Sequence, residues 1–193
     1  MNIDSAPSLH PLLASRWSPT GFDPGHEVSD VEVASLLEAA RWAPSAGNSQ
    51  PWAFLVGRRG DGTHRRLVPH LAGSSAAWAP SASLLVANLS HRYVEDTEWE
   101  YSEFSLYDLG QAVAHMTLQA QALGLHARQF RAFRRKEVGA EFEVPRHWEV
   151  TTMTAFGVPR QDARRPASDP AGSRVRRTVE QLGWPAATSA NTP

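Results

Sequence analysis

Residues 41–56 join a helix end, a polar turn and an apolar strand without a break, and they constrain the fold more than any other stretch. A capping-box pattern that begins at Ser29, followed by apolar residues at three- and four-residue steps, predicts a helix over about 29–42. Pro44 stops this helix, because the residue before a proline is disfavoured in the helical region. The polar residues that follow supply hydroxyl, amide and main-chain donors ahead of a strand predicted at about 52–57.

The rest of the chain predicts a loose alternation of strands and helices. The predicted elements are a strand at about 83–89, a long helix at about 105–123, a strand at about 126–131, a short helix at about 134–141 and a strand at 149–157. Gly124 is placed to end the long helix in a left-handed conformation. The arginine- and glycine-containing stretch after the first strand is interpreted as a solvated turn, not as a nucleic-acid patch. Because the GxGxxG pattern is absent, a Rossmann domain is not indicated.

Several segments resemble the nitroreductase family of FMN-dependent oxidoreductases. The most specific is Arg41-Trp-Ala-Pro-Ser-Ala-Gly-Asn-Ser-Gln-Pro-Trp52, which is similar to a family signature of arginine, any residue, Ala-Pro-Ser, a short gap, Asn, any residue and Gln-Pro-Trp. Further segments fit the family in the same order, namely 15–23, 108–125, 155–159 and the arginine set at 173–177. The resemblance therefore spans nearly the whole chain.

The resemblance implies an α+β fold, a nitroreductase-like three-layer sandwich with a mixed, mainly antiparallel sheet. It also implies an intertwined homodimer with one FMN in each of two interface clefts. A single domain is expected over residues 12–184, in keeping with a chain of 193 residues. Residues 1–11 and 185–193 are rich in Ala, Ser, Pro and Thr and are expected to be flexible or draped over a partner.

Composition excludes several classes of function. The chain has no cysteine, so disulfides and thiolate nucleophiles are absent, and the acidic residues show no metal-ligand spacing. A formal net charge of −1 gives no overall attraction to nucleic acid. No stretch approaches the roughly 20 apolar residues that a membrane helix needs. We expect no catalytic metal, no nucleic-acid or membrane partner, and a cytoplasmic location.

The resemblance implies which residues bind the cofactor. Arginines suit the FMN phosphate because the guanidinium group offers forked donors and stays charged. The residues implied at the phosphate and ribityl end are Arg16 and Ser18, with Arg174 and Arg176 closing over the phosphate, and Trp17 and Thr20 are also expected to bind the cofactor. Arg164, Arg165 and Arg177 compete for this closing role.

A second group of residues would contact the flavin ring. The second subunit is expected to contribute Pro44, Ser45, Ala46 and Asn48, although an asparagine in such a turn can also serve the turn alone. Gln129, Phe130, Arg131 and Ala132 align with the family segment that offers a main-chain N–H to flavin N5.

One position departs from the family. Members commonly carry a lysine or arginine where this chain has Thr20, and that charge stabilises the reduced flavin at N1 and O2. Arg131 or Arg128 could supply the missing charge.

The predicted function is that of an FMN-dependent oxidoreductase. Hydride from NADH or NADPH would pass through flavin N5 to a small planar acceptor, a nitroaromatic or a quinone, in a ping-pong reaction with no catalytic side chain. Two alternatives stay open: a flavin-binding storage, sensor or accessory protein with little turnover, and a specialised flavin reaction such as dehalogenation or flavin cleavage. Aromatic residues at 99–107 could stack planar substrates or pack on the dimer.

Overall fold

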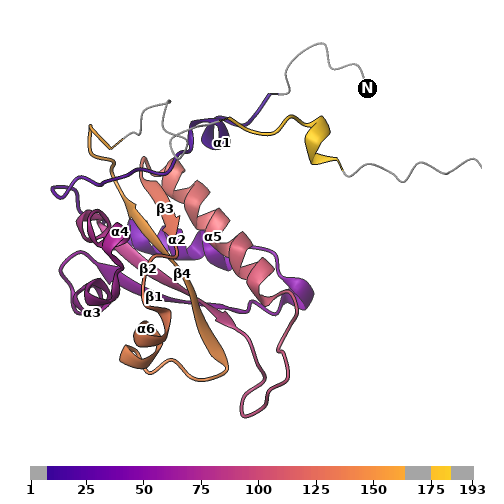
Figure 1. Ribbon diagram of the computed structural model, residues 1–193. Coiled ribbons are helices and arrows are strands. Elements are labelled where there is room, and N and C mark those ends of the chain that lie inside the picture. Colours follow the sequence, from indigo (N-terminus) through magenta and orange to yellow (C-terminus); the bar gives the residue numbers. More distant parts are fainter. Residues whose placement is uncertain (1–7, 164–174, 184–193) are drawn as a thin grey trace, which may run out of the picture.

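The centre of the protein is a four-stranded sheet with the strand order β1-β2-β4-β3 (Figure 1). The computed structural model describes residues 8–163 and 175–183. The strands are β1 (Trp52–Arg58), β2 (Leu84–His91), β3 (His126–Phe130) and β4 (Trp148–Gly157). All three strand pairs are antiparallel, so the mixed sheet that we expected is not found among the described residues.

Six α-helices and four short 3₁₀ turns lie in the described part of the chain. The helices are α1 (Pro11–Ser15), α2 (Asp30–Arg41), α3 (Gly62–Leu67), α4 (Gly73–Ala76), α5 (Ser105–Ala122) and α6 (Arg135–Glu141). The 3₁₀ turns are η1 (Ala46–Asn48), η2 (Val68–His70), η3 (Ala79–Ser81) and η4 (Glu180–Leu182). The seven elements predicted from the sequence are confirmed, with ends that agree to within two residues.

Three short α-helices escaped the sequence analysis, namely α4 and the two described next, α3 and α1. The stretch interpreted as a solvated turn contains α3, which begins because the Asp61 side chain accepts a hydrogen bond of 2.7 Å from the main-chain N–H of His64. Helix α1 begins at Pro11, the last residue of the segment that we expected to be flexible or draped over a partner. In both cases local capping or a first-turn proline starts a helix too short for a periodic pattern.

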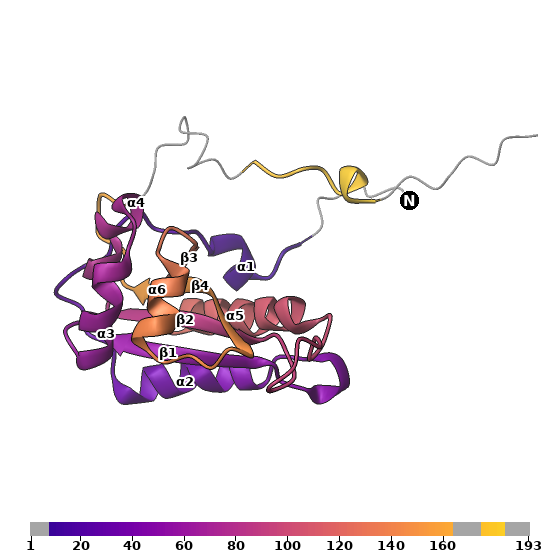
Figure 2. The ribbon, with the colours of Figure 1, turned by 60° about the horizontal axis from the view of Figure 1, so that its bottom comes forward.

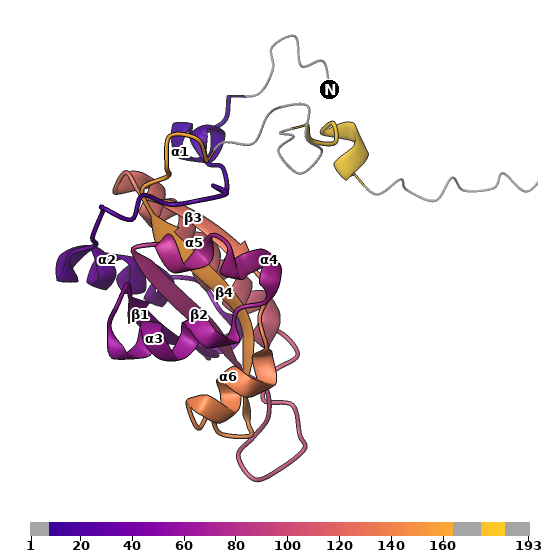
Figure 3. The ribbon, with the colours of Figure 1, turned by 60° about the vertical axis from the view of Figure 1, so that its left-hand side comes forward.

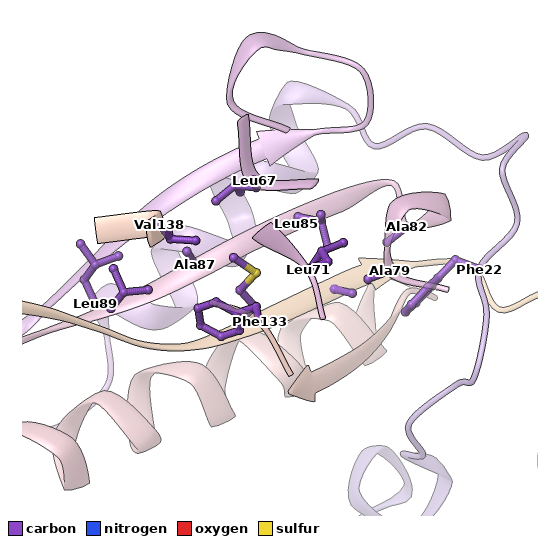
Figure 4. Close-up of a cluster of buried hydrophobic side chains, with 13 residues drawn as sticks. Phe22, Leu67, Leu71, Ala79, Ala82, Leu85, Ala87, Leu89, Phe133 and Val138 are labelled. Carbon is purple, nitrogen blue, oxygen red and sulfur yellow. The ribbon is translucent and has the colours of Figure 1, made fainter. Parts of the chain in front are cut away.

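Both faces of the sheet are covered by helices. On β2, Leu84 and Val86 point to the face against which α2 and α5 pack, a cluster that includes Leu36 and Met116 (Figure 2). The alternate residues of β2 point to the other face, where α3 and α6 lie (Figure 3). Figure 4 shows their partners on that face, which include Leu67 and Val138. Alternation along one strand therefore builds two separate apolar clusters.

Helix α5 ends as the sequence predicts. Gly124 has φ of 76°, and the main-chain N–H of Leu125 donates to the carbonyl of Ala120 at 2.8 Å, as in the predicted left-handed helix end.

Residues 175–183 are all exposed, and η4 projects away from the sheet in Figure 1.

Candidate functional site

The segment Arg16–Thr20 lies beside β3 and the residues that follow β4. The Trp17 ring meets the ring of His126 edge to face, with centroids 5.1 Å apart. The main-chain N–H of Thr20 donates to the carbonyl of Ala163 at 3.0 Å, and the Thr20 hydroxyl donates to the same oxygen. Arg16 donates weakly to the hydroxyl of Ser18, with Nη1 and Oγ 3.4 Å apart. The structure therefore brings these four predicted residues to one end of the sheet.

A cavity of about 320 Å³ opens next to this segment. Its lining combines hydroxyls, aromatic rings and one cation, and consists of Thr20, Ser74, Ser75, Trp78, Arg128, Phe130 and Ala132. Arg128 Nη1 donates to the carbonyl of Pro19 at 2.9 Å, and its guanidinium carbon lies 4.5 Å from the centroid of Trp78. Trp78 also meets Phe130 edge to face at 5.0 Å. The cavity thus offers apolar surface, hydroxyl groups and a positive charge together.

Two residues predicted beside the flavin ring point elsewhere. The Gln129 amide donates to the hydroxyl of Thr117 on α5 at 3.2 Å. Arg131 is exposed, and its Nη1 lies 3.4 Å from the carbonyl of Phe133. Their side chains are not among the groups that line the cavity, whereas their neighbours Phe130 and Ala132 are. Of the predicted segment, Phe130 and Ala132 therefore border the cavity, and its contact with the flavin stays a prediction.

The turn after α2 is held in an uncommon conformation. Gly47, Asn48 and Gln50 have φ of 58°, 56° and 49°, and the two non-glycine residues there are each disfavoured by roughly 1–2 kcal/mol. Hydrogen bonds within the turn offset this conformational cost. The main-chain N–H of Gln50 donates to the Ser45 hydroxyl at 3.0 Å, and the Gln50 amide donates to the Asn48 carbonyl at 3.1 Å.

The same turn is anchored to α5. The main-chain N–H of Ala46 donates to Asp108 Oδ2 at 3.0 Å, and Asp108 is only 2% exposed. Pro44 and Asn48 are exposed, while Ser45 and Ala46 are half-buried. The turn therefore presents exposed residues to its surroundings, and their contact with a ligand or a second subunit stays a prediction.

The two halves of the predicted site lie at opposite ends of α5. Asp108, which holds the turn, is in the first turn of the helix. Gln121, whose amide lies 3.4 Å from the hydroxyl of Ser15, is near its last turn. Thirteen helical residues at about 1.5 Å each separate these anchors by about 20 Å. One chain therefore does not bring Arg16–Thr20 and the turn at 44–50 together.

Of the two C-terminal arginines predicted at the phosphate, Arg176 lies within the described residues. Arg174 lies outside the described residues, as do its competitors Arg164 and Arg165. Arg176 is exposed, and its Nη1 donates to the carbonyl of the adjacent Val175 at 3.1 Å. Its contact with a phosphate stays a prediction.

Two histidines have a lowered pKa. Burial lowers the pKa of His64, which is 6% exposed. Burial, and then the neighbouring His147, lower the pKa of His91, whose ring is stacked between Tyr101 and Trp148 at centroid distances of 3.8 and 4.7 Å. The His91 ring is therefore part of a packed aromatic cluster.

Arginines in β1, in α3 and between them form ion pairs and hydrogen bonds within the fold. Arg58 pairs with Asp30 at 2.5 Å, and Arg66 pairs with Glu141 at 2.8 Å. Arg59 donates to the carbonyl of His26 at 2.8 Å. Within the described ranges, no three acidic or histidine side chains come together as a metal site, and no helix is long and apolar enough to cross a membrane.

Comparison with known proteins shows what the chain is similar to. The family model described as the nitroreductase family matches residues 13–87, which include Arg16–Thr20, the turn at 44–50, β1 and the first half of β2. A crystal structure described as an oxidoreductase containing FMN superposes with a TM-score of 0.82 at 27% identity, over 94% of this chain and 93% of that one. The chain is similar to the nitroreductase family in sequence over residues 13–87 and in fold over most of its length.

Two further proteins are similar to this chain over most of their length. A Streptomyces coelicolor protein with the provisional name NADH dehydrogenase/NAD(P)H nitroreductase is 28% identical over 177 residues, which cover 81% of this chain and 84% of the relative. The FMN complex of a provisionally named nitroreductase from Desulfovibrio desulfuricans has a TM-score of 0.68 at 27% identity, over 93% of this chain and 98% of that one.

Sequence reasoning missed part of this candidate site. It did not select Ser74, Ser75 or Trp78, which line the cavity, and it gave Asp108 no role. Asp108 did carry a signal. It lies beside Leu109 on the apolar face of a predicted helix, and a buried carboxylate there needs a hydrogen-bond partner.

Proposed function

We propose that this chain is an FMN-dependent NAD(P)H oxidoreductase that works as an intertwined homodimer with a three-layer sandwich fold. The observation that carries the proposal is the separation of the two half-sites along α5. A cofactor that needs both halves requires a second copy of the chain. The solved FMN-containing relatives at 27% identity support FMN as that cofactor.

One face of α5 supports the dimer. Leu106, Tyr107, Gly110 and Ala114 are exposed on α5 at three- and four-residue steps, so they form a continuous stripe. If two such stripes pack antiparallel about a two-fold axis, the Asp108 end of one helix meets the Gln121 end of the other. Each cleft would then combine Arg16–Thr20 and β3 from one subunit with the turn at 44–50 of the other.

The groups around the cavity fit FMN. A volume of about 320 Å³ is near the lower end of the roughly 300–1,000 Å³ of small-molecule sites, in keeping with a cleft that a second subunit completes. Trp78 and Phe130 offer apolar surface for a ring, and the serines and Arg128 offer donors for its polar edge. In the turn at 44–50, the buried Ser49 hydroxyl has no partner among the described residues.

The residues of this chain would bind and orient, while the cofactor supplies the redox chemistry. FMN held there would supply the redox chemistry, namely uptake of hydride at N5 from NADH or NADPH and transfer of electrons to a small planar acceptor, a nitroaromatic or a quinone, in a ping-pong sequence. Arg16 and Ser18 would meet the phosphate and ribityl end, and Arg174 and Arg176 would close over the phosphate. In this proposal no side chain of the described residues acts as a catalytic acid. A cytoplasmic location stays a prediction.

Thr20 favours one alternative function, that of a flavin-binding protein with little turnover. A hydroxyl stands where the family commonly has a cation, and its hydrogen bond to Ala163 engages it within the fold. Without a nearby charge, reduction of the flavin would be less favourable.

An anaerobic titration separates these functions. Purified, FMN-loaded protein is titrated with NADH and then NADPH while the flavin absorbance is followed, and a nitroaromatic or a quinone is then added. Bleaching followed by recovery is expected of a reductase. Binding of FMN without bleaching would favour the storage or sensor function, and failure to bind FMN would refute both. Light scattering on the same sample measures the dimer.

A further inference from the structure

Arg128 is the charged group of the cavity. It lies on β3 and is half-buried, and of the described residues that line the cavity it alone carries a charge. Two contacts fix its direction: the hydrogen bond from Nη1 to the carbonyl of Pro19 at 2.9 Å, and the face of Trp78 at 4.5 Å. A guanidinium held against an indole ring loses little further freedom when a ligand binds.

The second candidate for this role, Arg131, occupies a different environment. It follows β3, is exposed to solvent, and does not line the cavity. Its nearest interactions are with Phe133, through the carbonyl at 3.4 Å and the ring at 5.3 Å. A charge in bulk solvent is strongly screened, whereas a half-buried charge at a cavity wall is screened less.

Thr20 directly follows the residue whose carbonyl accepts the hydrogen bond from Arg128. The carbonyl that Arg128 holds belongs to Pro19, the residue directly before Thr20, and both Thr20 and Arg128 line the cavity. The Thr20 hydroxyl donates to Ala163, so its proton is engaged. The guanidinium of Arg128 therefore lies at the same wall of the cavity as a basic side chain at position 20 would, but it extends from β3.

We infer that Arg128 is the cation at the pyrimidine edge of the flavin, and that Trp78 is its positioning residue. The inference rests on the proposed FMN function. Hydride carries two electrons and one proton to N5, so its uptake adds one negative charge, which is borne at N1 and O2 when no second proton is taken up. A guanidinium at that edge binds the reduced cofactor more tightly than the oxidised one.

The test compares FMN binding in both redox states. Arg128→Met is to be compared with the wild-type chain for the dissociation constants of oxidised and anaerobically reduced FMN, and for the two-electron midpoint potential. We expect reduced FMN to lose about tenfold more affinity than oxidised FMN. This tenfold difference corresponds to a potential lower by about 30 mV for a two-electron couple. Arg128→Lys should recover most of the difference, and Thr20→Lys should restore it in the Arg128→Met background.

Arg134→Gln is the matched control. Arg134 is exposed, donates to the carbonyl of Pro69 at 2.7 Å, and does not line the cavity, so its loss should leave the potential unchanged. If Arg128→Met does not fold, Trp78→Leu tests the same arrangement and should lower the potential by a smaller amount. Circular dichroism confirms folding of each variant.

The outcomes separate the inference from the function on which it rests. A folded Arg128→Met protein that keeps the wild-type potential would overturn the inference alone, as would a shift seen only in Arg131→Gln. A wild-type chain that binds no FMN would overturn both. Equal weakening of oxidised and reduced FMN would show that Arg128 merely shapes the pocket, and would also overturn the inference.

Discussion

The main-chain N–H of Ala46 donates a 3.0 Å hydrogen bond to the buried carboxylate of Asp108. This bond ties the turn after α2 to the first turn of α5, over 62 residues of sequence. It also places the turn at the end of α5 that is far from Arg16. The bond therefore links a local backbone conformation to the geometry of the proposed dimer.

Replacing Asp108 should loosen the turn. Asp108→Ala leaves the Ala46 N–H without its acceptor, and an unsatisfied buried donor costs about 1–3 kcal/mol. We expect the free energy of unfolding in urea to fall by that amount, and the dissociation constant for FMN to rise several-fold. Asp108→Asn keeps an oxygen acceptor and should lose less. Glu103→Gln, at an exposed position shortly before α5, is the control, and equal losses in both variants would contradict the anchoring role.

Gly57 should not tolerate a side chain. It lies on β1, and a Cβ there would be 2.7 Å from the main-chain nitrogen of His64 and 2.9 Å from its Cα. Since both atoms belong to the backbone of α3, Gly57→Ala forces the helix away from the sheet and should cost about 1–3 kcal/mol in urea unfolding. Gly62→Ala is the matched control, because no atom lies within 4 Å of its added Cβ. Similar stability of the two variants would argue against close packing of α3 on β1.

Local patterns predicted the long elements well, and tertiary contacts explain what they missed. The helix from Ser29 and the turn after Pro44 are encoded by adjacent residues, so the sequence was sufficient for both. Helix α3 has six residues and depends on a single Asp61 cap, which leaves no periodic signal.

The cavity was beyond the reach of local patterns because its walls come from distant segments. The hydroxyl of Ser75 donates to the carbonyl of Ala132, and the N–H of Ala72 donates to that carbonyl at 3.0 Å. These bonds bring α4 to the end of β3, 57 residues away along the chain. The choice between Arg128 and Arg131 also needed the structure, because neighbouring segments do not reveal which side chain faces Trp78.

Acid should destabilise the fold through His64 and His91. Burial lowers the pKa of both below 6.5 in the folded chain, so the unfolded chain binds protons first as the pH falls. Their contribution is therefore fully present above pH 6.5 and is lost as the pH falls from there toward the folded pKa values. The check is the free energy of unfolding in urea at pH 7.5 and 5.5. His91→Phe keeps a ring between Tyr101 and Trp148 but removes the titration, so the difference should shrink.

The matched control for this pH effect is His10→Asn, at an exposed position before α1. It should retain the wild-type difference between the two pH values. If His91→Phe also retains the full difference, protonation of His91 does not contribute to the loss of stability in acid.

A charge on the exposed stripe of α5 should separate the subunits. Ala114 is exposed in the middle of the helix, four residues from Gly110, where two antiparallel helices would approach most closely. Ala114→Glu would place two carboxylates near the two-fold axis, so we expect a shift toward monomer in light scattering. FMN affinity should fall with it, because each cleft needs the turn at 44–50 from the second copy. Ala34→Glu makes the same change on an exposed position of α2 and should remain dimeric. A monomeric Ala114→Glu protein that binds FMN as tightly as wild type would show that one chain is a sufficient site, and would remove the reason for a shared cleft.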